Sequence, residues 1–185
     1  MANIASTETN KFVGISALKV VKGGFATGFT LGDGASLVEI PVAEDGGFTY
    51  TGGEPSIEHY KIHGLSADWT SRTTPGETSV NLFVPSITKS LLELFGFTVT
   101  TASSAAGIGS NVSGFTFAET SLAVNLGIVA FNDEGTKAFA IKAAKLSATI
   151  VFDEANSAKP IGISLTGSTS AGGDSDAMGI FEIGA

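Results

Sequence analysis

The sequence has two histidines, His59 and His63, whose four-residue spacing would place both on one face of a helix, where a pair can bind a metal ion. The surrounding residues alternate in a way that favours a strand instead. On a strand the two imidazoles would share a face but stand roughly 13 Å apart, too far to bind one metal ion together. Glu58 also precedes His59, whereas the glutamate of a zinc-protease motif follows its first histidine. We therefore interpret both histidines as surface or interface residues.

Other catalytic and ligand-binding motifs are incomplete. No serine stands at the centre of a G-x-S-x-G turn, and the nearest spelling, Gly162–Gly167, has one residue too many. The run Gly107-Ile108-Gly109 begins like a dinucleotide-binding loop but lacks the third glycine and a following helix. Asp174-Ser175-Asp176 begins like a calcium loop without its later ligands, which favours a solvated turn over a weak cation site. We expect no catalytic residue, cofactor or metal, and hence not an enzyme.

The composition narrows the class of protein further. The chain has no cysteine, which excludes disulfides and thiolate metal sites and is consistent with a reducing cytosol. Eighteen acidic and ten basic residues give a net charge of −8, the opposite of what binding to nucleic acid phosphates requires. No signal-peptide pattern and no apolar run of about 20 residues is present, so we expect neither signal-peptide export nor membrane insertion. Only 15% of residues are charged, below the usual ~25%, which suggests that partners cover much of the surface.

One segment has the pattern of a helix. Pro85–Gly96 offers Ser86 as an N-cap and Gly96 as the left-handed residue after the last turn. The pattern predicts a short helix over about residues 86–95, whose docking face has helical spacing and consists of Ile87, Leu91, Leu94 and Phe95. Such a short helix is marginal alone and must dock on a sheet.

The rest of the chain has the pattern of strands and turns. We expect a polar N-terminal arm over residues 1–10 and a single domain over 11–185, with a long glycine-rich loop at about 43–56 that could contain a hairpin through Phe48–Thr51. Turns are predicted at Asp33-Gly34 and Asn132–Gly135, and a bulge where the alternation shifts at 143–145. About ten strands are predicted, from twelve candidate segments over residues 12–20, 25–30, 36–40, 57–69, 79–84, 97–101, 115–117, 121–131, 138–142, 146–152, 161–167 and 178–183. The expected fold class is all-β, an antiparallel sandwich or barrel with one short flanking helix.

The order of these features resembles the major tail tube proteins of tailed bacteriophages, a family related to the inner-tube proteins of contractile injection systems. A polar arm, two strands, a glycine-rich connection and a hairpin precede the helical segment Pro85–Gly96. The run Lys142–Phe152, the Lys159-Pro160 pair, the strand Ile161–Gly167 and a short last strand follow. The resemblance covers the chain from about Phe12 to Ile183.

This resemblance implies a structural virion protein that assembles in the bacterial cytoplasm into hexameric rings, which stack into a tail tube. Its partners would be itself and other tail proteins, and DNA would pass through an acidic lumen without specific binding. The N-terminal arm, the C-terminal segment and the 43–56 loop would contact the next ring, the loop through Asp45, Gly46, Gly47, Phe48, Tyr50, Gly52 and Gly53. The alternative is a β-sandwich binding module, such as a phage fibre or adhesin that binds carbohydrate or a receptor; an enzyme on a β scaffold is less favoured.

Overall fold

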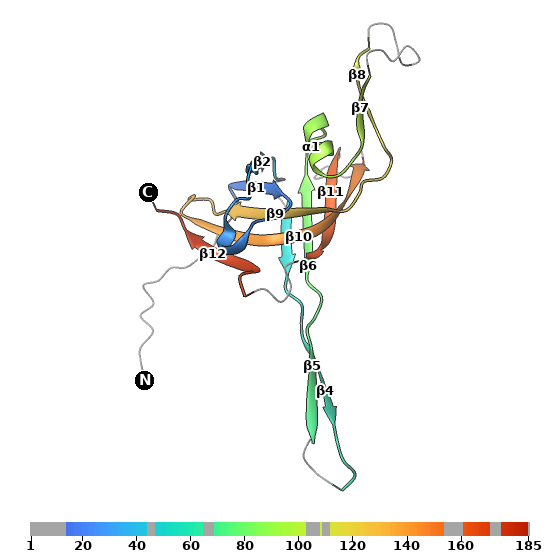
Figure 1. Cartoon of the computed structure of the whole chain (residues 1–185). Helices are drawn as coiled ribbons and strands as arrows, with labels where there is room; N and C mark the ends of the chain where they lie inside the picture. The colour runs from blue at the N-terminus through green and yellow to red at the C-terminus, as the bar shows by residue number, and fades with distance from the viewer. Residues whose placement is uncertain are drawn as a thin grey trace.

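The computed structural model describes residues 14–43, 47–64, 69–102, 108, 112–153, 161–170 and 175–184. In this part of the chain it contains twelve β-strands, one α-helix and one 3-10 turn (Figure 1). In chain order they are β1 (Ala17–Lys22), η1 (Thr27–Phe29), β2 (Val38–Ile40), β3 (Phe48–Thr51), β4 (Ser56–Tyr60), β5 (Thr70–Thr74), β6 (Ser79–Val84), α1 (Lys89–Leu94), β7 (Val99–Ala102), β8 (Gly114–Phe117), β9 (Val124–Phe131), β10 (Lys137–Phe152), β11 (Ile161–Thr169) and β12 (Met178–Glu182).

The strands form one main sheet and two separate hairpins. The main sheet has eight strands, in the order β2-β1-β9-β10-β11-β6-β3, with β12 paired to β10 beside this path. The hairpins pair β4 with β5 and β7 with β8. Every strand pair is antiparallel, which confirms the predicted all-β class with one short helix.

The long strand β10 organises the sheet. Its first half pairs with β12, its second half with β11, and β9 runs along its other edge. The register with β9 shifts between Ile141 and Ala144, so the predicted bulge is confirmed. At this bulge Lys142 N donates to Ala177 O, and Ser170 N donates to Ala143 O. Lys142 and Ala143 of the bulge thus bind the residue after β11 and the residue before β12, at the point where the partner of β10 changes from β12 to β11.

The main hydrophobic core lies on one face of the curled sheet. Alternate residues of each strand point into it, as the twofold period of a strand requires. Fully buried members include Leu18, Val20, Leu82, Leu126, Ile128, Ile141, Leu146, Ile163 and Leu165.

Helix α1 packs on this core but begins later than predicted. Thr88 is its N-cap: its backbone is extended, and its Oγ1 accepts a hydrogen bond from Leu91 N at 3.3 Å. The prediction of Ser86 as the cap was wrong, because Thr88 lies one step before the first helical residue. Gly96 has φ +85, and a Cβ there would stand 2.4 Å from Leu122 O, so glycine ends the helix as predicted.

Residues 25–30 do not form the predicted strand. They make a turn in which Gly28 and Phe29 have positive φ. Among the described residues, Phe29 is the one non-glycine residue with positive φ. Phe25 and Phe29 pack over Val129, Ala138 and Ala140 on the face of the sheet opposite to the main core. The aromatic residues that suggested a strand therefore cover a second, smaller cluster.

Strands β3 to β6 belong to one long hairpin, whose outer pair, β4 and β5, leaves the body. β3 pairs with β6 in the main sheet, and β4 pairs with β5 farther along the same hairpin. Figure 1 shows β4 and β5 projecting from one side of the body, while β7 and β8 project from the opposite side, next to α1. The hairpin expected before the helical segment, between 57–69 and 79–84, was wrong: β4 within 57–69 pairs with β5, and 79–84 pairs with the more distant β3.

Candidate assembly surfaces

The β4–β5 hairpin, here called the arm, has no core of its own. All ten residues of its two strands are exposed. Its ladder continues to Trp69, whose N donates to Tyr60 O at 2.8 Å, and Tyr60 Oη donates to Glu58 Oε2 at 2.8 Å. An isolated two-stranded hairpin is marginal in water. The described strands of the arm are therefore held by their own ladder and not by packing against a core.

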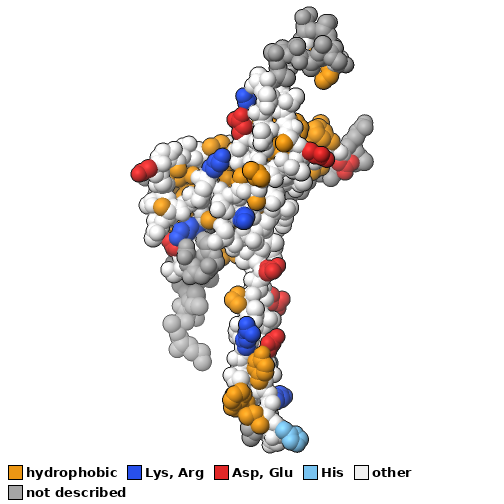
Figure 2. Space-filling view, turned by 45° about the vertical axis from the view of Figure 1, so that its right-hand side comes forward, with side chains coloured by type: hydrophobic (Ala, Val, Ile, Leu, Met, Phe, Trp, Pro, Cys, Tyr) orange, Lys and Arg blue, Asp and Glu red, His pale blue; other side chains and the backbone are white. Residues whose placement is uncertain are grey.

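Apolar side chains are exposed along this arm. Trp69 is 67% exposed, and Tyr60 beside it is also exposed. Together with Ile62 they form what we call the arm cluster, while Ile57, three residues before Tyr60 in β4, is exposed on the other face of the hairpin. Figure 2 shows hydrophobic side chains gathered on the projecting hairpin and toward its end. Large exposed apolar groups of this kind mark interaction sites more often than single scattered ones.

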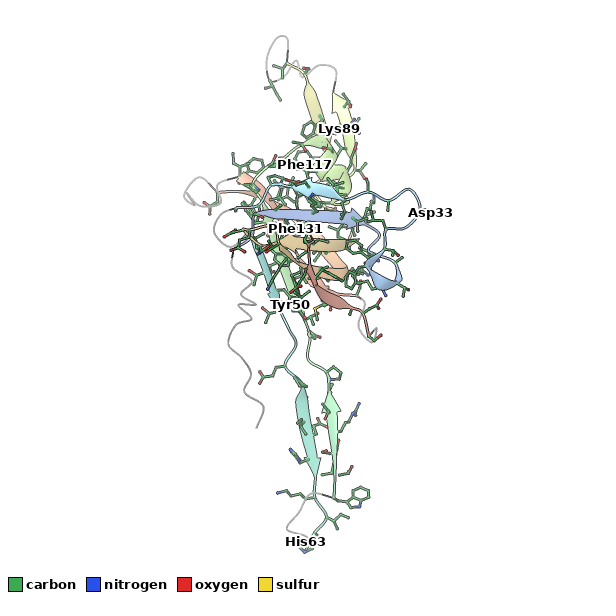
Figure 3. All side chains as sticks on the ribbon, turned by 90° about the vertical axis from the view of Figure 1, so that its left-hand side faces the viewer. Asp33, Tyr50, His63, Lys89, Phe117 and Phe131 are labelled. Atoms are coloured by element: carbon green, nitrogen blue, oxygen red, sulfur yellow. The ribbon has the colours of Figure 1, made fainter. Side chains whose placement is uncertain are left out.

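The two histidines lie on the arm. His59 is in strand β4, as the alternation predicted, and it pairs with Ser71 of β5. His63 lies beyond the strand, in the turn at the end of the arm (Figure 3). Within the described ranges, no group of three or more His, Cys, Asp or Glu side chains is placed to hold a metal ion.

A second apolar surface lies at the other end of the body. Phe152 and Ile161 are register partners at the end of β10 and the start of β11, and they are 68% and 51% exposed. We call this pair the end patch. Two residues inward along the same ladder, Ile150 packs against the core and its partner Ile163 is fully buried. The end patch is therefore the outward continuation of the core-facing row.

The sheet face opposite the core carries mainly hydroxyl and amide side chains over β3, β6, β11 and the second half of β10. Pairs across this surface join Thr49 to Asn81, Asn81 to Thr166, and Thr166 to Ser147. The hydroxyl face, as we name it, also includes Thr51, Ser79, Thr149, Ser164 and Ser168. Two apolar residues lie on the same side, the half-buried Val151 and the buried Phe83, which pairs with Ser164. Among the described residues of these strands, Lys145 is the one charged residue on this face. It is a nearly neutral surface on an acidic protein.

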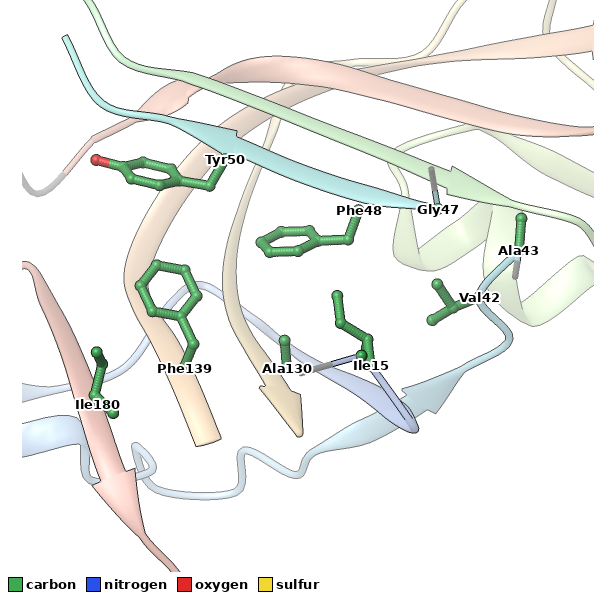
Figure 4. Close-up of a pocket in the computed structure, with 10 residues that line it drawn as sticks. Ile15, Val42, Ala43, Gly47, Phe48, Tyr50, Ala130, Phe139 and Ile180 are labelled. Carbon is green, nitrogen blue, oxygen red and sulfur yellow. The ribbon is translucent and has the colours of Figure 1, made fainter. Parts of the chain in front are cut away.

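The residues expected at an inter-ring loop lie at the base of the arm. Phe48 and Tyr50 point into an open apolar cavity of about 550 Å³, where their rings lie 6.5 and 5.7 Å from the ring of Phe139 (Figure 4). Gly47 lines the same cavity and is packed against Val42 and Ala43. Asp45 and Gly46 lie outside the described residues.

The other two residues of that expected loop are Gly52 and Gly53, between β3 and β4. A Cβ on Gly53 would stand 2.2 Å from Gly76 O. The two segments at the base of the arm therefore approach so closely here that position 53 requires glycine. Gly52 is exposed.

All four residues of the expected helix docking face reach the core. Leu91 and Phe95 are buried in it, and Ile87 and Leu94 pack against it. Sequence reasoning missed Leu92, which is fully buried. A buried leucine beside the docking face indicates that α1 is covered on more than one side.

An ion pair fastens the turn η1 to the sheet. Asp176 Oδ1 lies 2.8 Å from Lys142 Nζ, and its Oδ2 accepts a hydrogen bond from Gly28 N at 2.9 Å. The Lys142 hydrogen bond, aided by the Gly28 amide, lowers the pKa of the Asp176 carboxyl below its ordinary value. Of the incomplete calcium motif, Ser175 and Asp176 are described, and Asp176 binds the protein's own lysine.

We expect Asp176→Asn to lower the melting temperature at pH 7 and to lose this effect in acid. A carboxyl whose pKa is lowered by folding stabilises the protein above its unfolded pKa, about 3.9, and loses that contribution as the pH falls through the lower folded pKa. Melting curves of both proteins between pH 7 and pH 2 measure this. A difference in melting temperature that stays constant down to pH 2 would contradict a role for the charged carboxylate.

The comparisons with known proteins name no family. The sequence matches no protein-family model and no curated protein. Within the described ranges, no helix is long and apolar enough to cross a membrane. The chemistry of the chain's own surfaces is therefore the basis for a functional proposal.

Proposed function

We propose that this chain is a structural virion protein that assembles into stacked, hexameric rings and forms a tail tube through which DNA passes. The observation that carries the proposal is the pair of hairpins projecting from opposite sides of one body (Figure 1). A subunit with different contact surfaces at its two ends associates head to tail, and such contacts build rings or open filaments.

Unpaired strand edges support lateral association. β2 and β3 end the main path of the sheet, and β12 pairs with β10 alone among the described strands. Open edges are available for pairing with another chain, and ring closure removes this hazard. In the assembled ring these edges contact neighbouring subunits.

The hydroxyl face suits the wall of a DNA channel. A surface of serine, threonine and asparagine can bind water, and its single described lysine supplies little attraction for phosphates. DNA moves past such a wall without being held. This neutral wall is our refinement of the acidic lumen that the family resemblance implies.

Negative-stain microscopy and light scattering of the purified chain test the proposal. We expect rings with a central pore or stacked tubes, with masses that are multiples of the 18.7 kDa subunit. A protein that stays monomeric at high concentration, alone and with tail-tip or tape-measure protein added, contradicts it.

A carbohydrate- or receptor-binding module is the second candidate, and the exposed Trp69 and Tyr60 favour it. Aromatic rings displayed in this way serve as platforms for ligands as well as for protein partners. A glycan array with the wild-type chain and Trp69→Ala separates the two. Glycan binding by a monomer that Trp69→Ala abolishes would favour the binding module.

A further inference from the structure

We propose that residues 25–31, here called the lid, open and close over an apolar trough on the sheet while the rest of the fold stays intact. The lid is the part of the β1–β2 loop that contains η1, and the trough lies on the sheet face opposite to the main core. Opening uncovers the trough, so the lid determines whether this apolar surface is exposed. The inference does not depend on the proposed function.

The trough is formed by small residues on neighbouring strands. Ala138 and Ala140 of β10 lie beside Gly179 of β12, and none of the three has a side chain larger than a methyl group. Gly127 of β9 extends this floor, since a Cβ there would stand 2.6 Å from Cδ2 of Phe25. The aromatic rings of the lid therefore lie where the sheet has the least side-chain volume. An open apolar pocket of about 350 Å³ remains between the lid, the floor and β12.

Two phenylalanine rings hold the lid on the trough. The rings of Phe25 and Phe29 are 5.7 Å apart, and Phe29 meets Phe181 of β12 edge to face at 5.0 Å. Phe25 and Phe29 are half-buried, and the other five residues of the lid are exposed. Lifting the lid therefore exposes little apolar area beyond these rings and their floor, which is the property of a segment that opens locally.

Glycines stand at both ends of the lid. Gly23 and Gly24 have φ +88 and +86 on one side, and Gly34 has φ +72 on the other. A Cβ on Gly23, Gly32 or Gly34 would meet no described atom within 4 Å. Glycine in open space absorbs the backbone changes of a hinge without steric cost. Because β1 and β2 pair with each other, the two ends of the loop stay in place when the lid moves.

The closed lid is strained at Phe29. Its φ of +59 is disfavoured for a bulky side chain, and such strain persists only where neighbouring contacts impose it. One of these contacts is the hydrogen bond from Gly28 N to Asp176 Oδ2 at 2.9 Å. Asp176 is itself fixed by Lys142 Nζ, 2.8 Å from its Oδ1. Loss of the Asp176 carboxylate therefore releases a strained segment and favours the open lid.

Hydrogen exchange of the full-length wild-type protein tests whether the lid opens on its own. The amides of Phe25, Ala26 and Gly28 are all hydrogen-bonded in the closed lid, to Lys142 O, Thr30 O and Asp176. After correction for intrinsic rates, we expect them to exchange at least about 100-fold faster than the amides of residues 126–130 in β9. Lid amides as protected as those of β9 overturn the inference, because the lid would then open only when the sheet unfolds.

The variant Asp176→Asn tests the fastening without changing the shape of the side chain. At pH 7 we expect the lid amides to exchange about 5- to 10-fold faster than in the wild type, with the β9 amides unchanged. The matched control is Glu93→Gln, which removes the carboxylate of the exposed ion pair with Lys89 on α1 and should leave the lid unchanged. Unchanged lid exchange in Asp176→Asn, or equal acceleration of lid and sheet, overturns the inference.

A dye measurement shows whether the trough is uncovered. The fluorescence of 8-anilinonaphthalene-1-sulfonate, which binds exposed apolar surface, should rise at least about twofold with Asp176→Asn and stay at the wild-type level with Glu93→Gln. Faster exchange of the lid without this rise would also overturn the inference, because the loop would then fray while its rings stay on the floor.

Discussion

Replacing Phe95 by alanine is expected to lower the free energy of unfolding by about 3–5 kcal/mol, in the range for buried aromatic truncations. Phe95 is fully buried, and it is both the C-cap residue of α1 and a member of the main core. Its N donates to Leu91 O at 2.9 Å, which closes the last turn of α1. The truncation leaves a cavity where the helix end, the sheet and the following chain meet.

Urea unfolding measures this effect, and the exposed position Ser90 in the same helix supplies the control. Ser90→Ala should change the free energy of unfolding by less than about 0.5 kcal/mol, as surface substitutions do. A loss below about 1 kcal/mol for Phe95→Ala would mean that α1 does not dock on the core. The urea dependence should stay the same in both variants, because the fold that unfolds is unchanged.

The helix shows how far local patterns reach. The spacing of Ile87, Leu91, Leu94 and Phe95 indicated the buried face correctly, because helical periodicity is local. The start was misplaced because Ser86 and Thr88 are both good N-caps, and the extended exit from β6 decides between them. The burial of Leu92 follows from the return of the chain after Gly96, where Phe97 N donates to Leu92 O. That return is a tertiary contact with no local signature.

The strand pattern predicted the class of fold but not the arm formed by β4 and β5. Alternation identified β4 within residues 57–69, but it gave no sign of β5, whose residues are all exposed. The pairing of β3 with β6 crosses 27 residues between Thr51 and Ser79, so the base of the arm is fixed by non-local contacts. Sequence reasoning therefore detected strands at 57–69 and 79–84 and paired them wrongly.

The candidate surfaces were harder to predict than the fold. Phe152 and Ile161 belong to rows that have the pattern of core residues, and only the assembled sheet shows that these two are exposed at the end of the β10–β11 ladder. Trp69 gave one usable signal, a large aromatic residue in a polar stretch, but its exposure depends on how the hairpin leaves the body. The hydroxyl face was present in the sequence as alternate serines and threonines of β10 and β11, and joining them into one surface required the register.

Adding lysines to the hydroxyl face is expected to turn the proposed channel wall into a DNA-binding surface. The double variant Thr149→Lys and Thr166→Lys places two cations on adjacent strands, at positions that are exposed in the subunit. Repeated around a ring, these cations neutralise phosphates of a duplex in the channel. If about four phosphates are neutralised, the affinity for DNA should fall roughly 100-fold between 50 and 200 mM salt.

A matched variant decides whether the position of the lysines matters. Leu31→Lys and Ser36→Lys add the same charge at exposed positions in the chain before β2, away from the hydroxyl face. Assembled wild-type protein and this control should bind duplex DNA weakly in a fluorescence anisotropy titration, while the hydroxyl-face variant binds tightly at low salt. Equal binding by the two lysine variants would show that only net charge matters and would remove the hydroxyl face from the channel. Tight binding by the hydroxyl-face variant alone would support a channel lined by that face. The reason is that a cation attracts a phosphate within a Debye length, whereas its attraction for a more distant phosphate is screened by salt.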